Sequence, residues 1–136
     1  MAGKVVHFEI PLDDAARGRA FYEQALGWQL EQWGPVPYWT LAGAEGEGIG
    51  GGLTMRSDEV PGPLFYVGCD DIDATLTTVE AAGGTSLVGR SPIPGMGWMA
   101  LFQDTEGNRV GHFQLDPEAP TPEGGMDADW SPEATE

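Results

Sequence analysis

The chain has 136 residues, enough for one domain with its own core but too few for two independent domains. Its formal net charge is −16, from 22 acidic and six basic residues, which argues against a nucleic-acid partner because such binding needs Lys and Arg to neutralise phosphates. No apolar run approaches the roughly 18 residues of a membrane span, and the single cysteine, Cys69, fits a reducing compartment. We therefore expect a cytoplasmic protein with no nucleic-acid or membrane partner.

The first half of the chain predicts one strand, one helix and three short strands. Residues 5–10 alternate β-branched and aromatic side chains with polar ones, which is typical of a strand. Asp13 or Asp14 is expected to cap a helix over residues 15–26, and Gly27 is expected to end it. Three shorter strands, separated by Gly and Pro, are expected over residues 29–33, 38–42 and 49–56.

The second half predicts the same order of elements. Residues 64–69 form a strand, and Asp71 caps a helix whose apolar face carries Ile72, Leu76 and Val79. Gly83 and Gly84 end this helix, and three strands follow over residues 85–91, 97–103 and 109–115.

Matching residues recur at an offset of 57 positions, which indicates a duplicated unit. Examples are Phe8 with Phe65 and Gly27 with Gly84. We predict an α+β domain over residues 1–115, built from two βαβββ modules at about 4–57 and 62–115. Their strands would form an eight-stranded half-barrel cleft with the helices outside, an architecture suited to binding a small molecule. Residues 116–136 hold seven acids, four prolines and no base, and are expected to be an acidic disordered tail.

Three stretches resemble the glyoxalase, bleomycin-resistance and extradiol-dioxygenase superfamily, also called the vicinal oxygen chelate superfamily. The string His7-Phe-Glu-Ile-Pro, followed by Phe-Tyr at 21–22 and Leu-Gly-Trp at 26–28, is similar to its opening. Asp-Thr-Glu-Gly-Asn at 104–108, leading into Arg-Val-Gly-His-Phe-Gln, is similar to its closing turn and last strand. Pro-Ile-Pro-Gly-Met-Gly-Trp at 92–98 is similar to a loop of the glyoxalase-like branch. The resemblance covers residues 4–115 and implies the half-barrel fold more specifically than any reaction.

The resemblance also implies a divalent metal held by up to four ligands, two from each module. At those positions this chain has His7, Gly52, Leu64 and Gly111, so only the histidine matches. A divalent metal needs three or more N or O ligands from the protein. We therefore expect a metal-free cleft without a cofactor, and the alternative is a relocated metal site that uses His7, Glu9 and a third group.

Strand parity predicts which side chains face the cleft. On the strand over 64–69, Leu64, Tyr66 and Gly68 should face inward, while Phe65, Val67 and Cys69 should pack under the helix. His112 and Gln114 should point toward the helix layer or solvent. The glycines at 50–52 should either widen the cleft or form a plain hairpin. The expected ligand-binding residues are His7, Glu9, Tyr38, Thr40, Tyr66, Met99, Leu101, Gln103 and Phe113.

This lining suits a partly aromatic, mostly neutral small molecule. The first hypothesis is therefore a non-catalytic binding protein of the antibiotic-resistance type, acting as a homodimer. The second is a glyoxalase-like lyase, isomerase or dioxygenase with an altered metal site using His7 and Glu9. The third is metal-free acid/base catalysis by the same two residues, which lie two positions apart on one strand and could form a pair. Cys69 is not expected to be a nucleophile.

Overall fold

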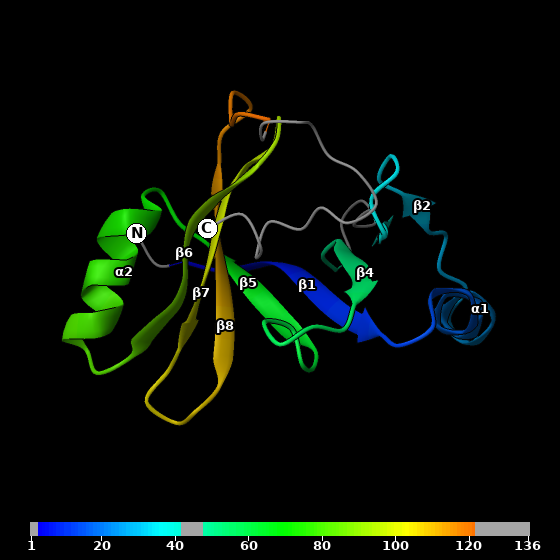
Figure 1. Ribbon diagram of the computed structural model, residues 1–136, viewed down its shortest axis with the longest axis horizontal. Coiled ribbons are helices and arrows are strands. Elements are labelled where there is room, and N and C mark those ends of the chain that lie inside the picture. Colours follow the sequence, from blue (N-terminus) through cyan, green and yellow to red (C-terminus); the bar gives the residue numbers. More distant parts are fainter. Residues whose placement is uncertain (1–2, 42–47, 122–136) are drawn as a thin grey trace.

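The computed structural model describes residues 3–41 and 48–121, which form one curled, eight-stranded sheet flanked by two helices (Figure 1). The α+β half-barrel predicted from the sequence is confirmed. The elements in chain order are β1 (Val5–Leu12), α1 (Ala15–Leu26), β2 (Glu31–Gln32), β3 (Tyr38–Leu41), β4 (Gly51–Met55), β5 (Leu64–Gly68), α2 (Ile72–Ala81), β6 (Thr85–Ile93), β7 (Gly97–Gln103) and β8 (Arg109–Leu115).

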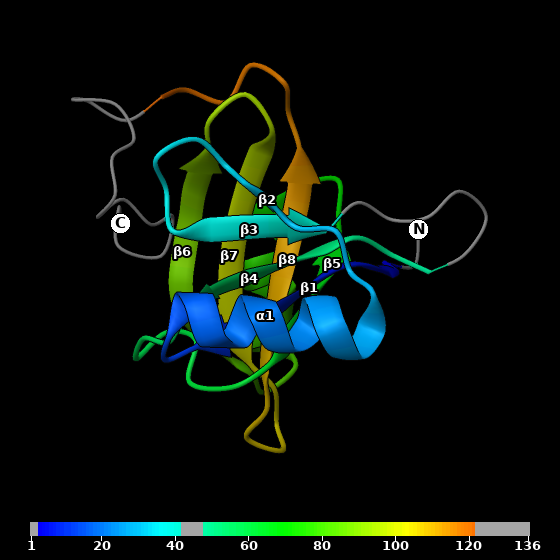
Figure 2. The ribbon, with the colours of Figure 1, turned by 90° about the vertical axis from the view of Figure 1, so that its right-hand side faces the viewer.

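The strand order shows the duplication directly. The sheet runs β2-β3-β4-β1-β5-β8-β7-β6, so each βαβββ module forms one half and the two halves are mirrored in order. They join where β1 pairs with β5 in antiparallel register, with His7 opposite Tyr66. The strands of the first module cross in front of β6, β7 and β8 (Figure 2), so the sheet curls around a concave face. One chain therefore supplies both halves of the concave face.

Both helices begin and end as the sequence predicts. The Asp14 carboxylate accepts a hydrogen bond from the backbone N–H of Arg17, and Gly27 ends α1 in a left-handed conformation (φ 71°). The Asp71 carboxylate accepts from the N–H of Ala74 at the start of α2. These caps determine the residues at which each helix begins after its preceding strand.

The core divides into two clusters, one in each module. The cluster of the second module has more buried members and includes the inward residues of β5 and β7. Its buried members are Leu64, Tyr66, Val88, Met99 and Leu101, with Val60 from the segment just before the module, and those of the first module are Leu12, Trp39 and Leu53.

One packing prediction on β5 is wrong. Phe65 was expected under a helix, but its side chain is 43% exposed. The reason is that α2 packs over β6, β7 and β8, while α1 lies at the opposite end of the molecule (Figure 1). The outer face of β5 is thus left uncovered around Phe65.

Residues 116–121 fall in the segment expected to be a tail, and the structure describes them as a turn against the β6–β7 hairpin. The Trp98 indole Nε1 donates to Asp116 Oδ2 (3.0 Å), and the Gly95 N–H donates to the Ala119 carbonyl (3.0 Å). The boundary expected at residue 115 therefore falls just before a turn whose residues hydrogen bond to the β6–β7 hairpin. The rest of the expected tail, 122–136, lies outside the described residues. Within the part of the chain that the structure covers, neither helix is long and apolar enough to cross a bilayer.

Candidate functional site: a tyrosine-lined cleft

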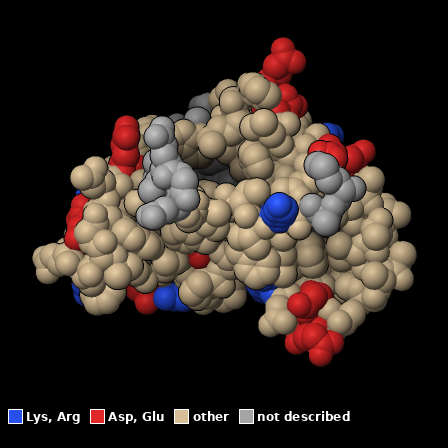
Figure 3. Space-filling model, turned by 180° about the vertical axis from the view of Figure 1, so that it is seen from behind, with Lys and Arg blue, Asp and Glu red and all other residues tan. Residues whose placement is uncertain are grey.

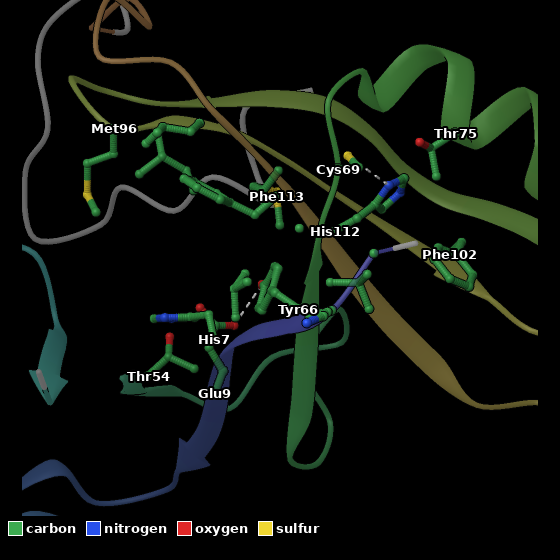
Figure 4. Close-up of a pocket in the computed structure, with 18 of the residues that line it drawn as sticks. His7, Glu9, Thr54, Tyr66, Cys69, Thr75, Met96, Phe102, His112 and Phe113 are labelled. Carbon is green, nitrogen blue, oxygen red and sulfur yellow. Dashed lines mark hydrogen bonds between the residues drawn. The ribbon is translucent and has the colours of Figure 1, made fainter. Parts of the chain in front are cut away.

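A cavity of about 1650 Å³ opens on the concave face and continues past the end of β5 toward α2. Figure 4 shows its two parts on either side of β5 and β8, with His7, Glu9 and Tyr66 in one and Cys69, His112 and Thr75 in the other. Seen from behind, the molecule has a central hollow bordered mainly by uncharged side chains, while acidic groups gather toward the margins (Figure 3). We call the part on the concave face the cleft.

In the first module, the ring of Tyr38 occupies the space beside Gly52. The two residues lie on the paired strands β3 and β4, and a Cβ atom on Gly52 would overlap the outer ring atoms and hydroxyl of Tyr38. The Tyr38 hydroxyl lies 2.7 Å from His7 Nε2, and the two rings are nearly parallel. A glycine on β4 thus allows a phenol to reach the cleft histidine.

A similar tyrosine–glycine contact lies in the second module, where the tyrosine comes from the first strand of the module instead of the third. The ring of Tyr66 on β5 lies against Gly111 on β8, and a Cβ atom on Gly111 would overlap the base of that ring. The Tyr66 hydroxyl donates a hydrogen bond of 2.9 Å to Oε1 of Glu9. Glu9 and Tyr66 are equivalent positions of the 57-residue repeat, so the duplicated strands meet through this hydrogen bond.

These contacts test whether the cleft could hold the metal that the family resemblance implies. Two of the four ligand positions are Gly52 and Gly111, and the volume next to each is filled by a tyrosine ring. The third position is Leu64, a buried member of the apolar core. Among residues 3–41 and 48–121 there is no group of three or more His, Cys, Asp or Glu side chains placed to hold a metal ion. The residues present do not fit a divalent metal.

The predicted effect of the glycine run is also wrong. The glycines at 50–52 were expected to widen the cleft or to form a plain hairpin. Instead Gly51 admits the ring of Phe8 on one face of β4, and Gly52 admits Tyr38 on the other. Strand glycines here permit the close approach of two aromatic rings rather than leaving open space.

Seven of the nine expected ligand-binding residues line the cavity, namely His7, Glu9, Tyr38, Thr40, Tyr66, Met99 and Phe113. The other two expectations are corrected. Leu101 points inward as expected but is fully buried in the core cluster beneath the cleft. Gln103 ends β7 opposite Thr85, away from the cavity lining.

The sequence interpretation missed several residues that line the cleft. Thr54 follows Gly52 at i+2 on β4, so parity could have placed it on the same face. Four more lining residues lie outside the strand faces that were expected to form the cleft, so strand periodicity could not predict them. They are Trp33, Met55, Arg56 and Met96. Arg56 is already engaged, since its Nε lies 2.8 Å from Asp13 Oδ1 and it donates to the Pro61 carbonyl.

Two polar residues of the cleft, His7 and Glu9, are each hydrogen bonded to a tyrosine hydroxyl. Burial lowers the pKa of His7 below its ordinary value of 6.5, so the ring is neutral at pH 7. Glu9 is only 6% exposed. Burying such a group is costly unless it is hydrogen bonded, and the Tyr66 hydroxyl supplies one such bond. The arrangement therefore offers phenol, imidazole and carboxylate groups to a ligand held between aromatic and methionine side chains.

Comparison with known proteins agrees with this architecture. The Glyoxalase/Bleomycin resistance protein/Dioxygenase superfamily matches residues 4–111. A glyoxylase-like domain-containing protein from Didymella fabae is 30% identical over 114 residues, which cover 78% of this chain and 89% of the relative. This chain belongs to the Glyoxalase/Bleomycin resistance protein/Dioxygenase superfamily.

Solved structures share the fold at low sequence identity. A glyoxalase/bleomycin resistance protein/dioxygenase superfamily member from Vibrio splendidus superposes with a TM-score of 0.60 at 16% identity, over 85% of this chain and all of that chain. Methylmalonyl-CoA epimerase from Mycobacterium tuberculosis gives a TM-score of 0.60 at 16% identity, over 83% of this chain and 88% of that chain. At this identity the likeness establishes the fold alone.

Proposed function

We propose that the protein is a metal-independent small-molecule-binding protein whose cleft sequesters a neutral, partly aromatic ligand. The observation that carries this proposal is the replacement of two family ligand positions by glycines with a tyrosine ring packed against each. Such a cleft offers flat apolar surfaces for stacking and a few directed hydrogen bonds in place of a Lewis acid.

The charges of the cleft support a neutral ligand. His7 is neutral at pH 7, and the one arginine of the cleft lining, Arg56, lies against Asp13. The buried Glu9 would repel a carboxylate placed beside it. Sequestration of an antibiotic or another aromatic natural product would use these properties, and resistance is the biological role we propose.

Metal analysis and fluorescence together test the proposal. The purified protein is expected to contain no stoichiometric divalent metal, and 1-naphthol is expected to quench tryptophan emission saturably with or without a chelator. Trp33 lines the cavity and packs edge-on to Tyr38, so it is a reporter inside the cleft. Tyr38→Ala should weaken 1-naphthol binding about tenfold, because an aromatic contact is worth about 1 kcal/mol or more.

The matched control is Phe21→Ala, which removes an exposed ring from α1 outside the cavity. This variant should bind 1-naphthol as the wild type does. A stoichiometric metal ion that is lost in His7→Ala would overturn the metal-free proposal. Absence of saturable binding across a panel of neutral aromatics would overturn sequestration.

Metal-free acid/base catalysis is the second candidate, and the buried Glu9 favours it. A carboxylate that accepts from one phenol and lies in an apolar cleft is suited to remove a proton next to a carbonyl group. Its test is deuterium uptake at the α-carbon of a 2-phenylpropionyl thioester in D₂O. Catalysis requires uptake by the wild type that Glu9→Gln abolishes, and uptake equal to the buffer rate excludes this reaction for that substrate class.

We also propose that the protein is a homodimer. The paired strands at the module junction carry exposed apolar side chains, Val5 and Val6 on β1 and Phe65 on β5, and a second copy would cover part of this surface. Light scattering of the full chain tests this directly, and a monomeric mass at micromolar concentration would exclude it.

A further inference from the structure

The second part of the cavity lies between α2 and the outer face of the sheet. We call it the α2 chamber, and its walls are Val67, Cys69, Thr75, Val79, Phe102 and His112. Ala74 and Thr78 on the same side of α2 also line the cavity and are exposed, so the chamber is open to solvent along the helix. Figure 4 shows Cys69, Thr75, Phe102 and His112 gathered there, apart from the cleft residues.

His112 is the polar residue at the base of this chamber. It lies on β8 with the parity predicted from the sequence, which points away from Phe113 and toward the helix layer. The neighbouring Gln114 confirms this direction, because its Oε1 accepts from the N–H of Ile72 at the start of α2. The His112 side chain is 1% exposed, and its Nε2 atom has no hydrogen-bond partner among residues 3–41 and 48–121. An orphaned polar atom in a buried side chain costs free energy unless something satisfies it.

The other ring nitrogen determines what Nε2 can offer. His112 Nδ1 lies 3.9 Å from Cys69 Sγ. Burial lowers the pKa of His112 to about 4 and raises the pKa of the Cys69 thiol, so both groups are neutral at pH 7. A thiol sulfur is a weak acceptor, whereas a neutral imidazole nitrogen accepts well. A thiol that donates to Nδ1 leaves the ring proton on Nε2, and this is the tautomer that a ligand with an acceptor oxygen requires.

We propose that the α2 chamber is a second small-molecule site, which binds a neutral compound with a carbonyl oxygen and an aromatic or branched apolar body. The His112 Nε2–H donates to the carbonyl oxygen. Phe102, which packs edge-on against the His112 ring, and Val79 on α2 contact the apolar body. The neutral His112 offers one neutral donor, which suits a carbonyl oxygen, while Lys4, Asp70 and Asp71 also line this cavity.

The chamber is separate from the cleft in its chemistry. The cleft has a phenol-bound imidazole and a phenol-bound carboxylate, whereas the chamber has a thiol-bound imidazole with an available donor. The chain has two histidines, His7 in the cleft and His112 in the chamber. Each part of the cavity therefore carries its own spectroscopic reporter.

The test is ¹⁵N-histidine NMR of the full chain titrated with acetophenone, a neutral aryl ketone. The His112 Nε2 signal should be that of a protonated nitrogen before ligand is added. It should then shift saturably with acetophenone. The same additions should slow alkylation of Cys69 by iodoacetamide, because the bound ketone covers the chamber. His112→Phe should weaken acetophenone binding about tenfold, as expected for loss of one buried hydrogen bond.

His7→Phe is the matched control, and it should leave the acetophenone affinity of the chamber unchanged. Three outcomes would overturn the proposal: an unprotonated Nε2, a saturable shift confined to His7, or no saturable shift at His112 up to the solubility of the ketone. Where His112→Phe folds poorly, protection of Cys69 in the wild-type protein still decides whether the chamber is occupied. None of these results depends on whether the cleft binds 1-naphthol.

Discussion

Both modules pack a tyrosine against a strand glycine, on β3 in the first and on β5 in the second, but they differ in how firmly the tyrosine is held. Each module packs a phenol ring against a strand glycine and hydrogen bonds it to a polar residue of β1. Tyr66 belongs to the large buried core of the second module, whereas Tyr38 is half-buried at the rim of the first. The helices differ in the same sense, since α2 buries Ile72 completely while α1 buries no residue. The second module is therefore the better-packed half of the cleft, and the first supplies a wall that can adjust around a ligand.

Truncating a helix residue in each module should reveal this difference most strongly. Ile72→Ala removes a fully buried side chain and should lower the free energy of unfolding by about 2–4 kcal/mol, through lost burial and the cavity left behind. Phe21→Ala on α1 removes a ring that is 60% exposed and should change it by less than about 0.5 kcal/mol. Urea denaturation of both variants measures the comparison. Equal losses would contradict the view that the second module carries the core.

Acid should destabilise the protein mainly through the second module. The pKa of His112 is lowered by burial from 6.5 to about 4 in the folded state. The unfolded chain therefore binds this proton first as the pH falls, and the free energy of unfolding drops between pH 6.5 and pH 4. A shift of this size corresponds to roughly 3 kcal/mol.

Urea midpoints at pH 7.5, 5 and 4 measure this loss. His112→Phe should remove most of the slope. His7→Phe should remove a smaller part, because burial lowers the pKa of His7 in the same direction. A slope unchanged by His112→Phe would show that other groups cause the acid sensitivity.

Replacing each of the two glycines by alanine should distinguish the rigid Tyr66 from the adjustable Tyr38. In Gly111→Ala the new Cβ would meet the base of the buried Tyr66 ring, which cannot move without disturbing the core, so we expect a loss of about 1–3 kcal/mol. In Gly52→Ala it would meet the outer end of the Tyr38 ring, which can swing outward, so we expect less than about 1 kcal/mol.

Gly62→Ala is the control for both glycine variants. A Cβ there would meet nothing within 4 Å, and the backbone needs no left-handed conformation. Thermal denaturation of the three variants measures the order. A larger effect at Gly52 than at Gly111 would reverse the assignment of the rigid and adjustable walls.

The sequence predicted the fold well because its signals are local. The capping residues Asp14, Asp71 and Gly27 and the strand alternation fixed the elements, and the 57-residue repeat paired them into modules. The inward parity of Tyr66 and the outward parity of His112 followed from strand periodicity alone. The caps and the strand alternation depend on residues close together in the chain, and the repeat can be read directly from matching residues in the sequence.

The site could be predicted less completely because its contacts are long-range. That Tyr38 fills the space of Gly52 depends on the register of β3 against β4, which no single segment encodes. The exposure of Phe65 depends on how far α2 lies from β5. The family pattern indicated which ligands are absent, but only the packing reveals that aromatic rings occupy their space.

Removing the two phenol hydroxyls should give the smallest effects on stability. Tyr66→Phe takes a donor from the buried Glu9 carboxylate and should cost about 1–2 kcal/mol, because burial prevents water from replacing the bond easily. Tyr38→Phe takes a partner from the half-buried His7 and should cost about 0.5 kcal/mol, since water can reach that nitrogen through the open cleft. A Tyr66→Phe/Glu9→Leu double variant should lose less than the sum of the single variants, because each single change removes the same hydrogen bond. Strict additivity would mean that the phenol and the carboxylate do not interact in solution, and the hydrogen bond that joins β1 to β5 at the cleft would then contribute nothing to stability.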